Sequence, residues 1–588
     1  MINKSNEFIR RILNFPAIRP SETFHFLLDD CSREDSRIWI LAKSEDVSCQ
    51  FQMLARAVAV ALDVLPLKEM DVSVEGQEVV EFVRNQAVKL KFEVEMDDGR
   101  MQVNVLKILD QLEDGIVPES HDLKRVLDYL GIKRWSACNR EVKFLDNEML
   151  LEGNTEEKRD MGILSSLMGF MIYCRGTLFD VLDNGAGRQI NGGSTNADQV
   201  IRFLNLDDFR CPITLEIMSD PVTIASGHTY DRASILKWFR AGNSTCPKTA
   251  NGIPFVETGR RNHDAGRFVG SSSVANEQAM KLLASFLVGR LVGGTMEQQN
   301  KAAFEIRLLT KTSIFNRSCL VEAGAIPPLL NLVTSRNSSC QENAMATLLN
   351  LSKNSKCKST IVGNGGLFLI LDVLKGGLKM EARQHAAGTL FYLTSVEEYR
   401  KMMGENPEFI PSLLELLRNG TDRGKKNALV TIFGLLMRPE NHWRVIAAGL
   451  VPLVVNLLKS FEREDLITDS LAVLTTLSER LDGAMAVLYA GALPIIVNVL
   501  SSCNSRASKE YCVSLLLALC INGGADAVPV LVKNSSLMGP LYSLLAEGNS
   551  KASKKASTLI RILHEYNEKT SSGLITPVFI EDQFINVW

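Results

Sequence analysis

The sequence lacks the patterns on which several functional classes depend. It has no Cys-x-x-Cys pair, and its twelve cysteines are scattered, which argues against a disulfide framework and for reduced thiols. Its formal net charge is only −3, so no basic field is available to hold nucleic acid. The N-terminal stretch has no apolar segment typical of a secretory signal. We therefore expect a cytoplasmic and/or nuclear protein that binds no nucleic acid.

Long apolar runs and cofactor motifs are also missing. The longest apolar run, residues 161–174, is closed by Arg175 and falls short of the roughly 20 residues that a membrane span needs. It predicts a buried core helix, and we expect no transmembrane segment. No P-loop, no G-x-G-x-x-G and no Ser-His-Asp arrangement is present, so no cofactor is predicted.

The first third of the chain has helical periodicity. Leu123, Val126, Leu127 and Leu130 are spaced for one helix face, Ser120 precedes them as a candidate N-cap, and Gly131 follows as a stop. We predict a helical N-terminal region over residues 1–190. A stretch rich in Asn, Gly, Ser and Thr then predicts a linker over residues 191–204.

The last half of the chain repeats with a period of 42 residues. Each repeat contains a segment that opens with a small residue and continues with Leu, Ile or Val, and these segments begin at Ala302, Ala344, Ala386, Ala428, Ser470 and Cys512, with a seventh at Ala556. The small residue suits a position where neighbouring helices approach closely, and the apolar residues suit burial against the next repeat. We call the predicted helices the anchor helices.

A second signature lies between these segments. Pro327, Pro411, Pro452 and Pro494 each end a recurring three-residue segment, and a Gly directly precedes three of these segments, at Gly324, Gly449 and Gly491. Gly ends one helix, and Pro fits the first turn of the next because its missing N–H has no partner there. The pattern resembles armadillo repeats, here over residues 277–568 and followed by a C-terminal tail at 569–588. HEAT repeats are the alternative with a similar period.

A short motif precedes the repeats. It begins with the residues DDFRCPI at Asp207 and continues through DPV at Asp220, GHTYDR at Gly227 and CPKT at Cys246. This motif resembles the first part of a U-box, the zinc-free relative of the RING domain, which docks a ubiquitin-conjugating enzyme. The resemblance implies a small α+β module in which Ile213, Trp238 and Pro247 form the docking surface.

The remaining motif residues are interpreted as structural. By resemblance and by residue type these are Cys211, Pro212, Asp220, Pro221, Gly227, Tyr230, Asp231 and Cys246, with Asp231 as the N-cap of the helix that carries Trp238. A RING needs eight zinc ligands, and this window offers only Cys211, His228 and Cys246, so no metal site is predicted.

The module is interpreted as incomplete. Thr249 is followed directly by residues that look like the linker after the family's closing helix, so we place a partial U-box at 205–249 and a linker at 250–276. A comparable shortening before Phe26 suggests a splice form or an imperfect gene model. Sequencing the transcript across codons 20–24 and 249–250 tests that hypothesis, and junctions fixed in the gene itself would contradict it.

The order of parts resembles the plant U-box/armadillo ubiquitin ligases. The predicted fold class is mainly α, an armadillo α-solenoid preceded by a helical region and the small module. The resemblance implies a RING-type E3 ubiquitin transferase that works without a covalent nucleophile. Its partners would be a ubiquitin-charged conjugating enzyme and protein substrates on the armadillo groove, and its pathway stress or defence signalling. A homodimer is compatible with the sequence.

Two alternatives follow from the residues. A chain with only part of a U-box is also consistent with a non-catalytic, substrate-binding armadillo scaffold. Nuclear import receptors share the solenoid, but the anchor helices here have no Trp, and Asn350 stands almost alone as the equivalent of their Asn ladder. The basic residues Arg423, Lys425 and Lys426 are interpreted as a solvated helix start.

Overall fold

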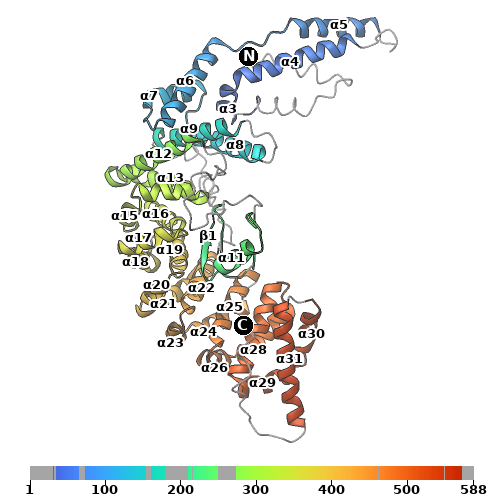
Figure 1. Ribbon diagram of the computed structural model, residues 1–588. Coiled ribbons are helices and arrows are strands. Elements are labelled where there is room, and N and C mark those ends of the chain that lie inside the picture. The colour runs from blue at the N-terminus through green and yellow to red at the C-terminus, as the bar shows by residue number, and fades with distance from the viewer. Residues whose placement is uncertain are drawn as a thin grey trace. The chain divides into compact units, whose positions relative to one another are not determined.

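The chain folds into two compact units. The computed structural model describes residues 31, 33, 35–64, 73–153, 160–179, 209–214, 216–224, 226–248, 273–460, 463–547 and 550–571 (Figure 1). The first unit takes in residues 1–200 and 257–305, and the second takes in 201–256 and 306–588. The motif upstream of Cys31, the junction after Thr249, and most of the predicted linkers and tail lie outside the described residues.

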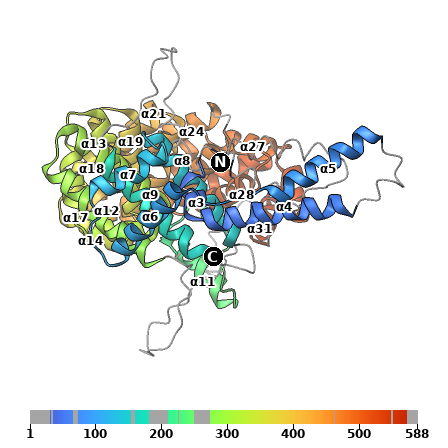
Figure 2. The same cartoon turned by 90° about the horizontal axis from the view of Figure 1, so that it is seen from above.

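The described part of the first unit is helical. Its helices are α3 (Arg37–Ala42), α4 (Ser44–Asp63), α5 (Val74–Lys89), α6 (Met96–Glu113), α7 (Ser120–Tyr129), α8 (Trp135–Gly153), α9 (Met161–Leu178) and α12 (Val274–Gly293). Helices α4 and α5 lie side by side, and Val58, Leu62 and Val80 are buried between them (Figure 2).

Helix α7 tests the predicted periodic segment. Leu123, Val126 and Leu127 are buried, and Gly131 has a φ of +68°, which suits a glycine stop. Ser120 is the first residue of the helix, whereas the N-cap position is held by Glu119. The prediction of Ser120 as the cap was therefore wrong by one residue, because an extended residue is needed before the first turn and Glu119 takes that conformation.

Helix α9 contains the longest apolar run. At 18 residues with a mean hydropathy of 1.2, it is long and apolar enough to cross a membrane, so the expectation that the run is too short was wrong on length. Three bent helix pairs in the repeats also pass that test as pairs. Leu164, Leu167 and Phe170 are fully buried, and α9 packs against α8 and α12, as predicted for a core helix.

A buried ion pair holds α9 within the first unit. The Arg175 Nε donates to a Glu305 carboxylate oxygen at 3.1 Å, and its Nη1 donates to Asn139 at 2.8 Å. The Trp135 indole N–H donates to the other Glu305 oxygen. A buried pair of this kind is stable only when its remaining donors and acceptors are also satisfied, and Asn139 and Trp135 do this here.

The predicted anchor helices are confirmed. The seven small residues at the start of the repeating segments are all buried, between 0% and 2% exposed. They lie in α13 (Met296–Thr312), α16 (Ser338–Leu351), α19 (Met380–Leu393), α22 (Asp422–Leu436), α25 (Glu464–Ser478), α28 (Arg506–Asn522) and α31 (Ser550–Ser571). From α16 to α31, each anchor helix packs on the next one.

A second helix of each repeat supports its anchor helix. These are α15 (Ile326–Val333), α18 (Gly366–Gly376), α21 (Phe409–Asn419), α24 (Leu450–Ser460), α27 (Leu493–Ser502) and α30 (Met538–Glu547). A further helix precedes each of them: α14 (Ile314–Glu322), α17 (Ser355–Gly363), α20 (Glu397–Glu405), α23 (His442–Ala447), α26 (Leu481–Tyr489) and α29 (Gly524–Val532), with a 3₁₀ turn, η1 (Pro439–Asn441), before α23.

The predicted Gly-Pro punctuation is present at the junctions. Gly324, Gly449 and Gly491 have φ values of +70° to +87°, a conformation that residues with a side chain rarely adopt. Proline occupies the first turn of α15 and α27. Gly365 has the same left-handed conformation at the α17–α18 junction, which the sequence pattern missed because no proline follows it.

Candidate functional site

The U-box-like module is built on a two-stranded hairpin and one helix. Strands β1 (Pro221–Thr223) and β2 (Thr229–Asp231) are antiparallel, with Val222 opposite Tyr230. Gly227, at a φ of +83°, makes the turn between them, and its N–H donates to the Ile224 carbonyl. Helix α11 (Arg232–Arg240) follows β2 directly and buries Ile235.

Asp231 has a different role from the predicted one. It occupies the N-cap position of α11, but its side chain caps no helical N–H. One carboxylate oxygen instead accepts three hydrogen bonds of 3.0 Å, from the Ser219 N–H, the Ser219 hydroxyl and the Asp220 N–H. The Arg232 Nε donates a hydrogen bond to the Asp220 carboxylate at 2.7 Å. The acidic pair therefore ties the residues before β1 to the start of α11.

Tyr230 and Cys246 join the strands to the second loop. The Tyr230 hydroxyl lies 3.1 Å from the Cys246 Sγ and accepts the Lys248 N–H at 3.3 Å. The Ser226 hydroxyl is also 3.1 Å from that sulfur. Both Tyr230 and Cys246 are fully buried, and burial raises the pKa of the Tyr230 phenol. Hydrogen bonds thus close a loop for which a RING uses metal.

Trp238 joins α11 to the same loop. Its indole N–H donates to the Thr245 carbonyl at 2.8 Å, and the Asn243 side chain donates to the Trp238 carbonyl at 3.2 Å. Trp238 remains partly exposed, as does Pro247 two residues beyond Thr245. The indole therefore orients the loop that carries Pro247 while it still reaches solvent.

Ile213 lies in the first loop. The loop is closed by the Cys211 N–H, which donates to the Glu216 carbonyl, and by the Met218 N–H, which donates to the Phe209 carbonyl, both at 2.9 Å. Cys211 is fully buried, while Pro212 and Ile213 are partly exposed. The three predicted docking residues thus come from two loops and the helix between them, and all three reach solvent.

No metal-binding geometry accompanies these residues. Among the described residues, no three His, Cys, Asp or Glu side chains gather in a way that could hold a metal ion. The His228 Nδ1 lies 3.4 Å from the Ser226 hydroxyl, which is itself 3.1 Å from the Cys246 Sγ.

The module also contacts the armadillo repeats of its own unit. Phe209 is 7% exposed, and its ring centroid lies 4.9 Å from that of Phe391 and 5.8 Å from that of Tyr392, both on α19. The Thr223 hydroxyl donates to the Lys353 carbonyl at 3.3 Å. We call the set Lys353, Phe391, Tyr392, Asp465 and Asp469 the anchor-helix face.

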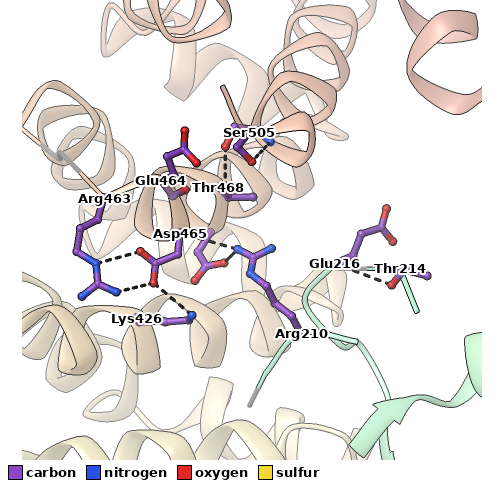
Figure 3. A network of polar contacts seen from close by, with 11 residues as sticks. Arg210, Thr214, Glu216, Lys426, Arg463, Glu464, Asp465, Thr468 and Ser505 are labelled. Atoms are coloured by element: carbon purple, nitrogen blue, oxygen red, sulfur yellow. Dashed lines mark hydrogen bonds and ion pairs between the residues drawn. The ribbon is translucent and has the colours of Figure 1, made fainter. Parts of the chain in front are cut away.

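Arg210 makes the polar part of this contact. Its guanidinium points at α25, where it pairs with the Asp469 carboxylate and lies 3.4 Å from the Asp465 carbonyl (Figure 3). The Arg210 side chain is 11% exposed and that of Asp469 is fully buried. Glu216 adds an exposed pair with Lys551 at 4.0 Å, which contributes little because solvent screens it.

Sequence reasoning missed this contact. Lys426, predicted to be part of a solvated helix start, is only 2% exposed and pairs with Asp465 at 3.3 Å, so that interpretation was wrong for Lys426. The available signal was Asp469 itself, an acidic residue directly before the small residue Ser470 of an anchor helix, where burial was expected. Nothing in the sequence pattern showed which cation meets it, because Arg210 lies 259 positions away.

Fold and module together define the class: an armadillo-repeat protein with a metal-free U-box. The family described as "Plant U-box protein ARM repeat region" matches residues 290–572, and the U-box domain family matches residues 206–256. "U-box domain-containing protein 19" and "U-box domain-containing protein 18" from Arabidopsis thaliana are each 41% identical, over 96% of this chain and 85% of their own lengths. The chain belongs to this family of plant U-box/armadillo ubiquitin ligases.

Structural comparison gives armadillo proteins as well. A computationally designed armadillo repeat protein for modular peptide recognition is 21% identical, covers 40% of this chain and 99% of its own, and has a TM-score of 0.38.

Proposed function

We propose that this chain is an active ubiquitin ligase that docks a charged ubiquitin-conjugating enzyme through Ile213, Trp238 and Pro247. Family membership and the arrangement of the module support this role. The conjugating enzyme supplies the reactive thioester, and the ligase contributes by holding it beside the substrate lysine. Catalysis of this kind rests on proximity and orientation.

One observation carries the proposal. Hydrogen bonds that involve Tyr230, Asp231 and Trp238 join the two loops and α11, while Ile213, Trp238 and Pro247 stay partly exposed. A small set of apolar residues on a rigid support is the usual form of a docking surface whose energy is concentrated in few side chains.

Self-ubiquitination of the purified chain, with a panel of conjugating enzymes, tests the proposal. Ile213→Ala should lower the rate about ten-fold or more, because loss of one central apolar contact costs about 1.4 kcal/mol or more of docking energy. Leu236→Ala is the matched control: it removes the same apolar bulk from an exposed position of α11, 42% exposed, that is not among the proposed docking residues. Its rate should stay within about two-fold of the parent.

Two results would contradict the ligase proposal. Equal losses for Ile213→Ala and Leu236→Ala would mean that no defined docking surface exists. No activity with any conjugating enzyme would favour the second function, a substrate-binding armadillo scaffold. The small size of the described module, with two three-residue strands and one nine-residue helix, is the observation that favours this second function.

Substrate binding is assigned to the armadillo repeats. We propose that protein substrates are held along the anchor helices, which pack in an unbroken row from α16 to α31. Solenoids of stacked repeats present extended surfaces of this kind, suited to extended partner segments.

A further inference from the structure

An aromatic residue and an arginine of the U-box are both buried against the armadillo repeats. Phe209 and Arg210 are consecutive in sequence, and they reach two anchor helices, α19 and α25, that are separated by α22. Contacts of one dipeptide with two separated helices constrain both its direction and its spacing. These two contacts accompany the Thr223–Lys353 hydrogen bond and the exposed Glu216–Lys551 pair.

Phe391 and Tyr392 form the aromatic part of the anchor-helix face and pack against the Phe209 ring. Phe391 and Tyr392 are each 1% exposed and pack edge to face at 5.2 Å, and the Phe209 ring meets both. Gly388 lies beside that ring: a Cβ at this position would be 3.4 Å from the Phe209 Cζ, at the limit of ordinary contact, and 3.1 Å from the Leu349 Cδ1. Edge-to-face packing of this kind stabilises aromatic clusters beyond simple area burial.

Asp465 and Asp469 form the acidic part of the anchor-helix face, and Asp469 is the residue that receives a cation from outside α25. Both Asp465 carboxylate oxygens are already engaged, by Arg463 at 2.9 and 3.1 Å and by Lys426 at 3.3 Å. Asp469 is fully buried, and its second oxygen has no hydrogen-bond partner among the described residues. A buried carboxylate without a cation is strongly unfavourable, so the site requires an arginine or its equivalent.

We propose that the anchor-helix face is a receptor site for an extended protein segment in which an aromatic residue is followed by arginine. The chain's own Phe209–Arg210 occupies this site, and a substrate segment of the same chemistry exchanges with it. The assignment to substrates rests on the proposed substrate-binding role of the repeats. The site itself rests only on the contacts of Phe209 and Arg210.

Exchange of Phe209–Arg210 for a substrate segment would also affect the loop that carries Ile213. Ile213 lies three residues after Arg210 in the same loop, which the Arg210–Ile217 bridge closes. A segment that replaces Phe209 and Arg210 therefore detaches the loop that carries a predicted docking residue. The tethered pair competes as an intramolecular ligand with an effective concentration of the order of 1 mM, so a substrate needs further contacts or a high local concentration.

Binding of a fluorescent hexapeptide with the sequence of residues 209–214 to the full chain tests the site. The double variant Phe209→Ala/Arg210→Ala, in which the tethered pair is removed, should bind the peptide at least about ten-fold more tightly than the parent, because competition is lost. Fluorescence anisotropy measures both affinities. Arg240→Ala is the matched control, since it removes an exposed arginine from the same module and should bind as weakly as the parent.

Changes in the peptide keep the test independent of protein folding. A peptide with Ala in place of its arginine, or in place of its phenylalanine, should lose at least about ten-fold in affinity for the double variant. Adding Asp469→Asn to the double variant should lower its affinity for the unaltered hexapeptide by a similar factor. Equal binding of all peptides, equal affinity for parent and double variant, or no binding to the double variant at about 1 mM peptide would overturn the proposal. None of these measurements involves ubiquitin transfer, so they are separate from a failure of ligase activity.

Discussion

At the residue scale, Asp469 is a buried titratable group at the centre of the contact between Arg210 and α25. Burial raises its pKa to about 6, while the positive charges of Arg210 on the U-box and Lys426 on α22 oppose that shift and Asp465 on the same helix adds to it. Tyr511 on α28 also faces this cluster, and burial raises its pKa as well, so it stays a neutral phenol at neutral pH. The carboxylate is therefore charged at neutral pH and becomes protonated under mildly acidic conditions.

Peptide binding should accordingly depend on pH. In the Phe209→Ala/Arg210→Ala variant, the loss of Arg210 removes one cause that lowers the Asp469 pKa, so the carboxyl should titrate at about 6 or above. Because only the charged form attracts the peptide's arginine, affinity should fall about ten-fold between pH 7.5 and pH 5, in proportion to the ionised fraction. Anisotropy titrations across this range measure it. Affinity that stays constant, or rises towards acid pH, would remove Asp469 from the contact.

The same shift has a defined sign for stability. The folded-state pKa of Asp469 lies above its unfolded value of 3.8, so the native state binds the proton more tightly. The contribution of Asp469 to stability is thus most favourable below pH 4 and declines as the pH rises towards 6. The peptide's arginine weakens this trend, because it stabilises the charged form as Arg210 does in the parent chain.

At the element scale, the repeats depend on small residues where helices approach closely. Gly434 on α22 faces the end of α19, and a Cβ at this position would lie 2.1 Å from the Thr394 Oγ1. That hydroxyl donates to the Phe391 carbonyl at 2.6 Å, and Phe391 is part of the anchor-helix face. The packing of neighbouring repeats is therefore linked to the position of Phe391 in the anchor-helix face.

Gly434→Ala should destabilise the second unit. The added methyl group must displace Thr394 or separate α19 from α22, and overpacking of this kind costs about 1–3 kcal/mol. Chemical denaturation followed by circular dichroism measures the change. Gly363→Ala, on α17, is the control because its Cβ would meet nothing within 4 Å, and it should change the stability by less than about 0.5 kcal/mol. If both variants are equally stable, close approach at Gly434 is not a constraint.

At the scale of the whole molecule, the U-box belongs to the same compact unit as the armadillo repeats that follow it. Its contacts with those repeats span 255 and 259 sequence positions at Arg210 and 130 at Thr223. The U-box is thus not an independent domain joined to the repeats only by a linker. Its first loop and β1 are parts of the folded second unit.

Exchange on the anchor-helix face should loosen that part of the molecule. When the parent chain is saturated with the hexapeptide, amide hydrogen exchange at residues 210–224 should accelerate about ten-fold or more, because these residues lose their support from α19 and α25. Mass spectrometry of the labelled chain measures this. The peptide with Ala in place of arginine is the control and should leave the rates unchanged. Binding without faster exchange at 210–224 would place the peptide at a different site.

Parts of this structure could be predicted from local pattern alone. The anchor helices follow from a 42-residue period of small and apolar residues, and the turns at Gly324, Gly449 and Gly491 follow from the need for glycine before the next helix. These features depend on contacts between neighbouring repeats, so each repeat carries the information for its own position. The U-box was recognised differently, from the resemblance of a short motif to a known family.

The role of individual charged side chains could not be predicted in this way. Lys426 looked like a solvated lysine, and Asp231 looked like a helix cap, because each is found in a sequence context where that role is common. In the structure, Lys426 is buried beside Asp465, and Asp231 turns to the Ser219 and Asp220 backbone. The role that each of these two side chains takes depends on a partner from a different element of the structure.

The sequence by itself determined the solenoid and its register, because short-range spacing of apolar, small and turn residues is sufficient to specify these, and it indicated the U-box through resemblance to a known family. Only the tertiary structure decided that Phe209 and Arg210 would meet Phe391, Tyr392 and Asp469. The physical reason is that a cation lowers the cost of burying a charged carboxylate, and folding brings Arg210 to Asp469 from 259 positions away.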